Sequence, residues 1–431
     1  MDHLSFRLSD DDKLRMNDAM KLDEQDPLHH FRSRFLFPSD SRGQPKTYFC
    51  GNSLGLQPDT AKASVEQVLE AWHHLAVDGH FAGPHPWMEY HRRLAGPMAD
   101  IVGAKEEEVT IMNTLTTNVH LALGSFYRPT GQRTKILLEA DAFPSDRYAV
   151  ESWVKLHGLD PEVDIHLLQA DAQGYLSPDL IHDAIVKAGD RLALVWLGNV
   201  NYYTGQYLPM DLISGWAHEV GALAGFDLAH AAGNVPLNLH DDSVDFATWC
   251  TYKYLNGGPG SIAGFYVHER WNAHPRLAGW WGQQRSTRFD MRTPFMPEPG
   301  AEGWQISNQP MLSMAPLQAS LALFQEAGRE RLREKSLTLT SYLEQMLGKI
   351  HLPGMQILTP AQPEERGCQL SVYIPQHAEE IYRRLLASGV IVDFRKPQVI
   401  RVAPVPLYNS FQDIWKLGHH LQDIVRQVHH S

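Results

Sequence analysis

The fold of this chain is decided by the stretch Ala222-Leu223-Ala224-Gly225-Phe226-Asp227-Leu228-Ala229-His230, in which an apolar run ends in a carboxylate and an imidazole follows. A second apolar run, Phe246-Ala247-Thr248-Trp249, comes shortly afterwards and leads to Lys253. Short runs that are apolar throughout are typical of strands buried on both faces of a sheet. Two neighbouring strands of this kind would bring Asp227 and Lys253 to the same edge of the sheet.

The same pattern extends on both sides of this stretch, from about residue 109 to residue 270. Strands separated by helices predict an α/β fold with a mostly parallel sheet and with functional loops at the carboxyl ends of its strands. The other apolar runs are 109–112, 135–138, 192–197 and 264–267, and the helical patterns begin near Thr117, Ser145 and Met210.

The regions outside this core differ in character. Residues 1–45 are polar and predict an N-terminal arm, and residues 46–310 form the predicted large domain. An amphipathic helix is expected after Pro58-Asp59-Thr60, and a loop-rich stretch runs from about residue 275 to residue 310. Residues 311–431 contain a long helical stretch, three short strand patterns and a closing helix, so we expect a smaller α+β C-terminal domain there.

Composition narrows the class of protein further. The 431 residues carry a formal charge of −12 with histidine neutral, which argues against nucleic acid or a membrane surface as the main partner. The three cysteines are far apart and no C-x-x-C motif occurs, so neither a disulfide framework nor a metal site is expected. With no apolar stretch long enough to span a membrane, the sequence predicts a soluble cytoplasmic protein.

Two motifs suggest chemistry, and the first is Gly51-Asn52-Ser53-Leu54-Gly55, which matches the G-x-S-x-G elbow of serine hydrolases. In those enzymes the elbow follows several strands and an oxyanion loop. Here only 50 residues precede it and their sequence shows no sheet, so a tight glycine turn is the better interpretation. A hydrolase using Ser53 stays a remote alternative.

The second motif is the pair Asp227 and Lys253, which matches what pyridoxal 5′-phosphate requires. That cofactor needs a lysine for its aldehyde and a carboxylate beside its pyridinium nitrogen. Its phosphate is bound best at a helix N-terminus, which Leu115-Thr116-Thr117 would provide. Phe143-Pro144-Ser145-Asp146 follows the next strand and offers a flat partner for the ring. Each feature alone is ordinary, but all of them occur in order along one alternating sheet.

Taken together, longer strings resemble the kynureninase family over about residues 45–425. The most specific are Ala142-Phe143-Pro144-Ser145-Asp146 and Tyr252-Lys253-Tyr254-Leu255-Asn256-Gly257-Gly258-Pro259-Gly260; Asp227-Leu228-Ala229-His230-Ala231 and the segment from Arg401 to Ser410 agree with them. The resemblance implies a fold type I enzyme dependent on pyridoxal 5′-phosphate, with a seven-stranded sheet, working as a homodimer with active sites at the subunit interface. It implies hydrolytic cleavage of L-kynurenine or 3-hydroxy-L-kynurenine in tryptophan catabolism and NAD biosynthesis.

The resemblance also implies roles for individual residues. Lys253, Tyr252 and Asp227 would be catalytic, and Arg401 would bind the substrate carboxylate, for which a planar guanidinium is suited. His80, Ser307 and Asn308 would contact the substrate ring, and the strings around them resemble the eukaryotic type that favours 3-hydroxykynurenine. The cofactor would be held by Leu115, Thr116, Phe143, Pro144, Ser145, Asp146, Gly198, Asp227, His230, Tyr252, Lys253, Trp280 and Asn308.

One position departs from the family pattern, because Gly198 stands where some relatives carry a hydroxyl residue, and only its backbone could contact the cofactor. Two other functions remain open at this point. Another fold type I enzyme, a desulfurase or an aminotransferase, would share Asp227, His230 and Lys253, although a desulfurase would need a cysteine on a mobile loop. A non-catalytic scaffold would be expected to have lost Lys253 or Asp227.

Overall fold

The computed structural model describes residues 16–429, which form two compact units. The larger unit comprises residues 60–326 and the short segment 360–367. The smaller unit combines the described residues up to Asp59 with residues 327–359 and 368–429, so the polar N-terminal region belongs to the same unit as the C-terminal one. The division into an arm, a large domain and a small domain at residues 45 and 310 stays a prediction, and residues 1–15 of the arm lie outside the described residues.

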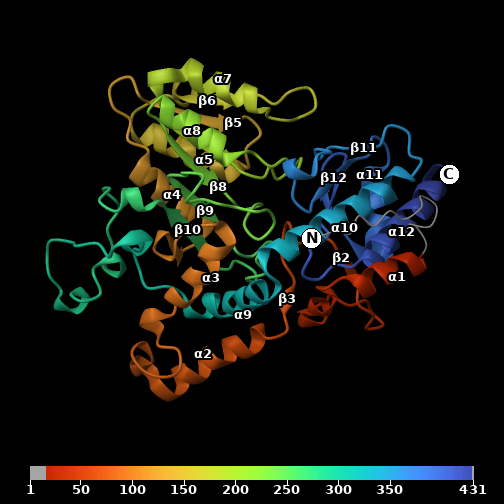
Figure 1. The fold of residues 1–431 in the computed structure, drawn as a ribbon, viewed down its shortest axis with the longest axis horizontal. Helices are drawn as coiled ribbons and strands as arrows, with labels where there is room; N and C mark the ends of the chain where they lie inside the picture. The colour runs from red at the N-terminus through yellow and green to blue at the C-terminus, as the bar shows by residue number, and fades with distance from the viewer. Residues whose placement is uncertain (1–15, 430–431) are drawn as a thin grey trace, which may run out of the picture. The chain divides into compact units, whose positions relative to one another are not determined.

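The larger unit is built on a seven-stranded sheet with the order β4-β10-β9-β8-β7-β5-β6. The four pairings from β9 to β6 are parallel, and β10 runs antiparallel to both of its neighbours. This confirms the predicted mostly parallel α/β sheet (Figure 1). The strands are β4 (Val109–Met112), β5 (Lys135–Glu139), β6 (Ile165–Leu168), β7 (Leu192–Gly198), β8 (Leu223–Asp227), β9 (Phe246–Trp249) and β10 (Ala263–Val267).

Six of these strands coincide with the apolar runs of the sequence, and β6 does not. It lies at the edge of the sheet, where His166 and Leu167 are only partly buried, so its sequence lacks a continuous apolar run.

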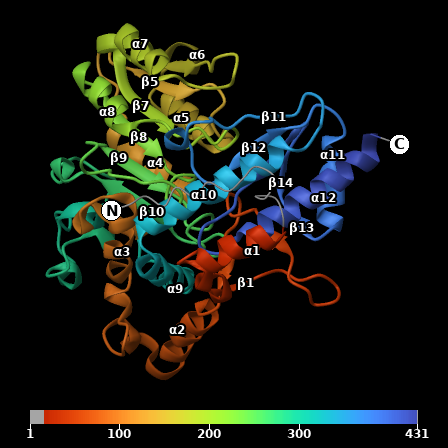
Figure 2. The same ribbon diagram turned by 45° about the vertical axis from the view of Figure 1, so that its right-hand side comes forward.

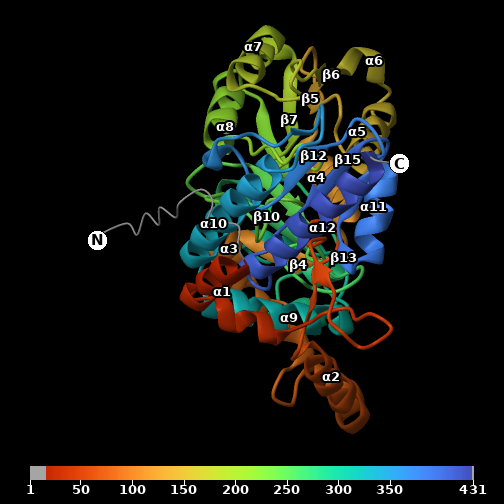
Figure 3. The same cartoon turned by 90° about the vertical axis from the view of Figure 1, so that its right-hand side faces the viewer.

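Helices cover both faces of this sheet, as expected when parallel strands are joined by crossovers. Figure 3 shows α7 and α8 on one face and α5 and α6 on the other. α4 packs against α5, and α7 packs against α8. The helices of this unit are α2 (Ala61–Leu75), α3 (Arg92–Val102), α4 (Leu115–Phe126), α5 (Pro144–Leu156), α6 (Pro161–Asp164), α7 (Pro178–Ala188), α8 (Met210–Glu219) and α9 (Met311–Ala327).

Local sequence explains where these helices begin. α5, α6 and α7 each start with a proline, whose fixed backbone angle suits the first turn and whose missing N–H is not needed there. At α7 the side chain of Ser177 also accepts a hydrogen bond from the backbone N–H of Leu180 at 3.2 Å. Beneath the sheet, Phe126 and Trp196 stack on the ring of Phe246, with centroids 4.5 and 5.7 Å away.

The smaller unit has a four-stranded antiparallel sheet with the order β11-β12-β15-β14. α12 packs against α1, α10 and α11 beside it (Figure 2). The long helical stretch of the sequence is interrupted at Gly328, where φ is +78°. The elements are α1 (Met16–Gln25), β1 (Phe35–Leu36), β2 (Thr47–Tyr48), β3 (Gln57–Pro58), α10 (Arg329–Gly348), β11 (Gln356–Ile357), β12 (Leu370–Tyr373), α11 (Ala378–Ala387), β13 (Val390–Ile391), β14 (Asp393–Arg395), β15 (Val399–Val402) and α12 (Phe411–His429).

Within residues 16–429, no helix is both long and apolar enough to cross a membrane.

Candidate active site

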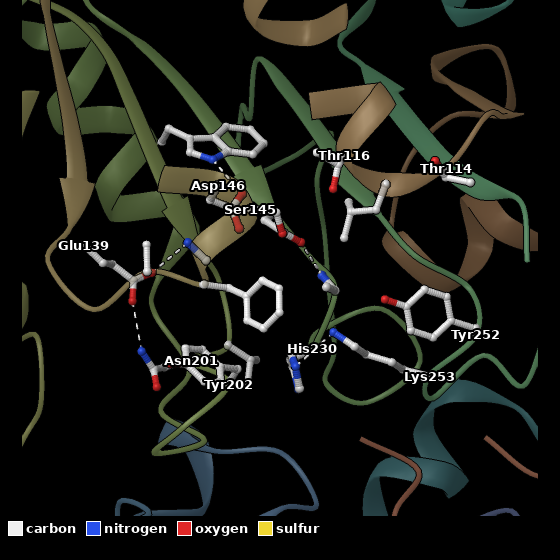
Figure 4. A pocket seen from close by; sticks show the side chains of 18 of the residues that line it. Thr114, Thr116, Glu139, Ser145, Asp146, Asn201, Tyr202, His230, Tyr252 and Lys253 are labelled. Atoms are coloured by element: carbon white, nitrogen blue, oxygen red, sulfur yellow. Dashed lines mark hydrogen bonds between the residues drawn. The ribbon is translucent and has the colours of Figure 1, made fainter. Parts of the chain in front are cut away.

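A pocket opens in the larger unit at the carboxyl ends of β5, β7 and β8, where the crossover rule places functional loops. Figure 4 shows the polar side chains that converge on it. Much of the predicted cofactor set lines this pocket. The lining includes Leu115, Thr116, Phe143, Ser145, Asp146, Gly198, Asp227, His230, Tyr252 and Lys253. Pro144 is in the first turn of α5 and is not one of the lining residues.

The centre of the pocket is a carboxylate facing an amine. Asp227 is the last residue of β8, and its Oδ1 accepts a hydrogen bond from the backbone N–H of Ala229 at 2.7 Å. Lys253 follows the end of β9, and its Nζ lies 3.1 Å from Nε2 of His230. The positive charge of Lys253 lowers the pKa of Asp227, while burial raises it more strongly. The pairing inferred from two adjacent strand ends is therefore present in the fold.

A helix N-terminus supplies uncharged donors on another side of the pocket. α4 begins at Leu115, and Thr114, Leu115 and Thr116 all line the cavity. The Thr114 side chain does not cap the helix; its hydroxyl lies 3.2 Å from that of Thr117 instead. The first backbone N–H groups of a helix have no partner within it, and they favour an anion. This end of the pocket therefore suits a phosphate group.

An aromatic wall closes a further side of the pocket. Phe143, at the start of α5, is 46% exposed. The ring of Tyr202 meets Phe143 edge-on, with centroids 5.4 Å apart and planes at 85°. An exposed phenylalanine held in place by a second ring offers its face to a flat ligand.

Two carboxyl groups of the pocket, buried Asp146 and partly buried Asp227, interact with each other, and the pKa of each lies above its usual value. Burial raises the pKa of Asp146 well above its usual value, and the nearby charge of Asp227 raises it further. Hydrogen bonding between them raises the pKa of Asp146 and lowers that of Asp227. Asp146 also accepts a hydrogen bond from Nε1 of Trp196 at 3.0 Å. The interaction between the two groups therefore favours the proton on Asp146, and Lys253 favours the ionised form of Asp227.

Tyr252 contributes a neutral phenol. Burial raises its pKa above the usual value, so the hydroxyl keeps its proton at neutral pH and acts as a hydrogen-bond donor. The Nζ of Lys253 lies 5.8 Å from the centre of the Tyr252 ring.

These groups fit pyridoxal 5′-phosphate. Orphan donors at the start of α4 suit its phosphate, Phe143 suits its ring, Asp227 suits its protonated ring nitrogen and Lys253 its aldehyde. The arrangement is also specific in its spacing along the sheet, because each group follows a different strand.

Four other predicted residues belong to the same unit but do not line the pocket. His80 and Trp280 are joined through a row of aromatic contacts in which Phe81 and Phe289 lie between them. The segment of Trp280 packs against the segment that carries Ser307 and Asn308, since the backbone N–H of Trp281 donates to the carbonyl of Ile306 at 3.2 Å. Ser307 and Asn308 are exposed.

Arg401 and Ser53 belong to the smaller unit and contact each other there. The guanidinium of Arg401 is fully buried and forms an ion pair with Asp393, and its Nη2 lies 3.3 Å from the hydroxyl of Ser53. Ser53 itself donates to Asp393 at 3.0 Å. A serine nucleophile is activated by a histidine in the usual triad, whereas this hydroxyl is bound by a carboxylate and a guanidinium.

The cysteines do not have the character of nucleophiles. Cys250 and Cys368 are buried, and Cys50 is partly buried. Burial raises the pKa of the Cys50 thiol to about 12 and also raises that of Cys250. Thiols of this kind stay protonated and are weak nucleophiles.

Sequence reasoning missed several groups in the pocket, among them Glu139, Asn201 and Tyr202. Glu139 is the last residue of β5, and burial raises its pKa to about 7. A charged residue at the end of an apolar run is usually interpreted only as the point where the strand ends. The signal that could have identified it is its position, because it ends a parallel strand at the same edge as Asp227.

Comparison with known proteins agrees with this description. Residues 332–421 match the model of the kynureninase C-terminal domain family. A kynureninase of Xanthomonas campestris pv. campestris strain B100 is 52% identical over 420 residues, which cover 95% of this chain and 98% of the relative. A kynureninase of Xanthomonas euvesicatoria pv. vesicatoria is 52% identical over 412 residues, or 94% and 96% of the two chains.

Solved structures with the same fold include enzymes of a different activity. A cysteine desulfurase from Escherichia coli superposes with a TM-score of 0.74 at 17% identity, covering 93% of this chain and 98% of its own. A C-DES mutant with glycine covalently linked to its PLP cofactor also gives 0.74, at 19% identity, covering 88% and 96%. At this level of identity the likeness shows the fold alone.

The raised pKa of buried Asp146 predicts a pH-dependent stability. An unfolded aspartate ionises near pH 3.8, whereas folded Asp146 keeps its proton to a higher pH, so wild-type stability falls as pH rises above 3.8. Asp146→Asn removes this cost, and we expect its Tm without cofactor to match wild type near pH 4 and to exceed it by about 2 °C or more at pH 8. The exposed Asp183→Asn is the control, and parallel pH profiles for wild type and Asp146→Asn would contradict the assignment.

Proposed function

Because the chain belongs to the kynureninase family, we propose that its pocket cleaves the Cβ–Cγ bond of L-kynurenine or 3-hydroxy-L-kynurenine, giving an anthranilate and L-alanine. As a family member, the chain is a hydrolase of carbon–carbon bonds that depends on pyridoxal 5′-phosphate. The observation that carries the proposal for the site is the convergence of Lys253, Asp227, Phe143 and the start of α4 on one cavity. Bound there, the cofactor supplies an electron sink for carbanion chemistry at the substrate.

Individual residues of the pocket have separate roles in the proposed reaction. Lys253 Nζ is the base that removes the proton from the substrate Cα, and His230, 3.1 Å away, orients it. Asp227 would keep the ring nitrogen of the cofactor protonated, and Phe143 would offer its ring as a stacking partner. Tyr252, a neutral phenol that lines the pocket, would relay a proton or donate a hydrogen bond where charge develops on the leaving fragment.

The other predicted contacts complete the proposal. Leu115, Thr116, Ser145, Asp146 and the backbone of Gly198 would hold the cofactor from within the pocket. Arg401 would bind the substrate carboxylate with its planar guanidinium, and its burial and ordered partners keep that group in a fixed orientation. A desulfurase is disfavoured because the thiol groups carry raised pKa values or are buried.

Lys253 gives the direct test of the site. Lys253→Ala should abolish turnover and the visible absorbance of bound cofactor, because the covalent bond to the aldehyde cannot form. Lys253→Arg is the matched variant, which keeps a positive charge beside Asp227 and should lose both signals as well. Absorbance spectra and the release of fluorescent anthranilate from kynurenine measure the two properties. Retention of both signals by either variant would overturn the assignment.

We also propose that 3-hydroxykynurenine is the preferred substrate. Exposed polar groups at Ser307 and Asn308, and His80 in the adjoining aromatic cluster, could hydrogen-bond a ring hydroxyl. We expect kcat/KM to be at least about tenfold higher for 3-hydroxykynurenine than for kynurenine, and we expect Asn308→Ala to reduce this ratio of the two kcat/KM values. An equal or higher kcat/KM with unmodified kynurenine would contradict this substrate preference.

The assembly we propose is a homodimer with active sites at the interface, in the cytoplasm, where three free cysteines stay reduced. The support is an apolar surface on the larger unit. Leu69 and Trp72 on α2 and Phe81 beside it are 42%, 63% and 63% exposed, although the spacing of apolar residues along α2 is that of a packed helix. Trp280, a predicted cofactor contact outside the pocket, is also exposed and joins the same aromatic row as Phe81.

Disrupting this surface should separate the subunits and stop turnover. We expect Trp72→Glu to sediment as a monomer and to lose at least about tenfold in kcat/KM, because a buried unpaired charge would oppose association. Leu156→Glu, at a residue 74% exposed on α5, is the control and should stay dimeric. Sedimentation velocity measures the outcome, and a fully active wild-type monomer would refute the proposal.

A further inference from the structure

Glu139 uses both of its carboxylate oxygens to hold one loop of the pocket. It is 5% exposed and lies at the end of β5. Its Oε1 accepts a hydrogen bond from the backbone N–H of Gly198 at 2.8 Å, and its Oε2 accepts from Nδ2 of Asn201 at 3.0 Å (Figure 4). Both partners donate, so residue 139 has to accept twice.

The orientation of the Asn201 amide is fixed by its other end. Its Oδ1 accepts hydrogen bonds from the backbone N–H of Tyr203 at 2.9 Å, from that of Thr204 at 2.9 Å and from the Thr204 hydroxyl at 3.2 Å. If the amide were rotated by 180°, its NH₂ group would point at these three donors, which would then have no acceptor. Asn201 can therefore only donate toward Glu139, and a glutamine at 139 would set one NH₂ group against another.

The backbone at Gly198 is adapted to this contact. A side-chain carbon at that position would lie 3.1 Å from Oε1 of Glu139, closer than an ordinary contact. Glycine thus allows the carboxylate to reach the backbone N–H. This gives a physical reason for glycine at the position where some relatives have a hydroxyl residue.

The loop held in this way forms part of the proposed cofactor site. Gly198, Val200, Asn201 and Tyr202 all line the pocket. Tyr202 meets the ring of Phe143 at 5.4 Å, and Gly198 lies beside Asp227 in the register of β7 and β8. A shift of this loop would move both Tyr202, which contacts the Phe143 ring, and Gly198, which lies beside Asp227.

We propose that Glu139 is a positioning residue of the active site, a required double hydrogen-bond acceptor that fixes the 198–202 loop and through it Tyr202 and Phe143. The proposal rests on the proposed site, in which Phe143 contacts the cofactor ring. In this role Glu139 does not contact the reacting atoms.

A swap of the two hydrogen-bonding groups tests this directly in the holoenzyme. Glu139→Gln places donor against donor, and Asn201→Asp places acceptor against acceptor. In the double variant the new amide at 139 donates to the new carboxylate at 201, still accepts from Gly198, and leaves the charge of the pair unchanged. Glu151→Gln, on the outer face of α5 where Glu151 pairs with Arg147, is the control for the same substitution.

We expect each single variant to lose about tenfold or more in kcat/KM and to change the visible circular dichroism of bound cofactor, because a buried group loses its partner. The double variant should return to within about threefold of wild type, with the wild-type dichroism. Glu151→Gln should behave as wild type.

The outcomes separate this proposal from the proposed function. Dichroism reports the cofactor's surroundings even if wild-type protein does not cleave kynurenine, so failure of the function leaves the rescue test standing. Single variants that do not fold, beside a double variant that folds with wild-type dichroism, support the proposal. A double variant no better than the worse single variant, or an unaffected Glu139→Gln, overturns it.

Discussion

The desolvation of three carboxyl groups at one edge of the sheet is the constraint on which the pocket depends. Glu139 and Asp146 are buried and Asp227 is partly buried, and an unpaired charge removed from water costs several kcal/mol. Each group has local partners: two N–H donors for Glu139, the Trp196 indole for Asp146, and the Ala229 N–H together with the Lys253 charge for Asp227. These partners come from several strands and loops, so the compensation exists only when β5, β7 and β8 are in their observed register.

The position of the strand ends at one edge of the sheet explains how one fold can carry different chemistries. Desulfurases superpose on almost the whole chain although few residues are shared. The parallel sheet places strand ends at a common edge whatever the residues are, and the residues at those ends decide the reaction. In this chain the thiols are withdrawn from the chemistry by burial, whereas an amine, a carboxylate pair and a phenol converge on the cavity.

The sequence was sufficient for features that follow from local pattern. Asp227 and Lys253 end or follow apolar runs, and Thr116 begins a helix after a strand, so periodicity alone places them at the same edge. Edge strand β6 was missed because its burial is incomplete, and the break at Gly328 because one glycine rarely ends a helical pattern. Glu139 also ends an apolar run, but its role and that of Asn201 could not be found in this way, since they arise from hydrogen bonds between a strand end and a turn about 60 residues later.

The charge balance of the pocket resolves an apparent conflict in an acidic chain that binds anions. A phosphate and a substrate carboxylate must enter a protein of net charge −12, beside the acids Glu139, Asp146 and Asp227. The start of α4 offers N–H donors without adding a formal charge, so it attracts a phosphate and forms no ion pair with the acids. Burial and the charge of Asp227 raise the pKa of Asp146, whereas the charge of Lys253 favours the ionised form of Asp227. Limiting the negative charge in this way would let the same cavity bind both a protonated ring nitrogen and a phosphate.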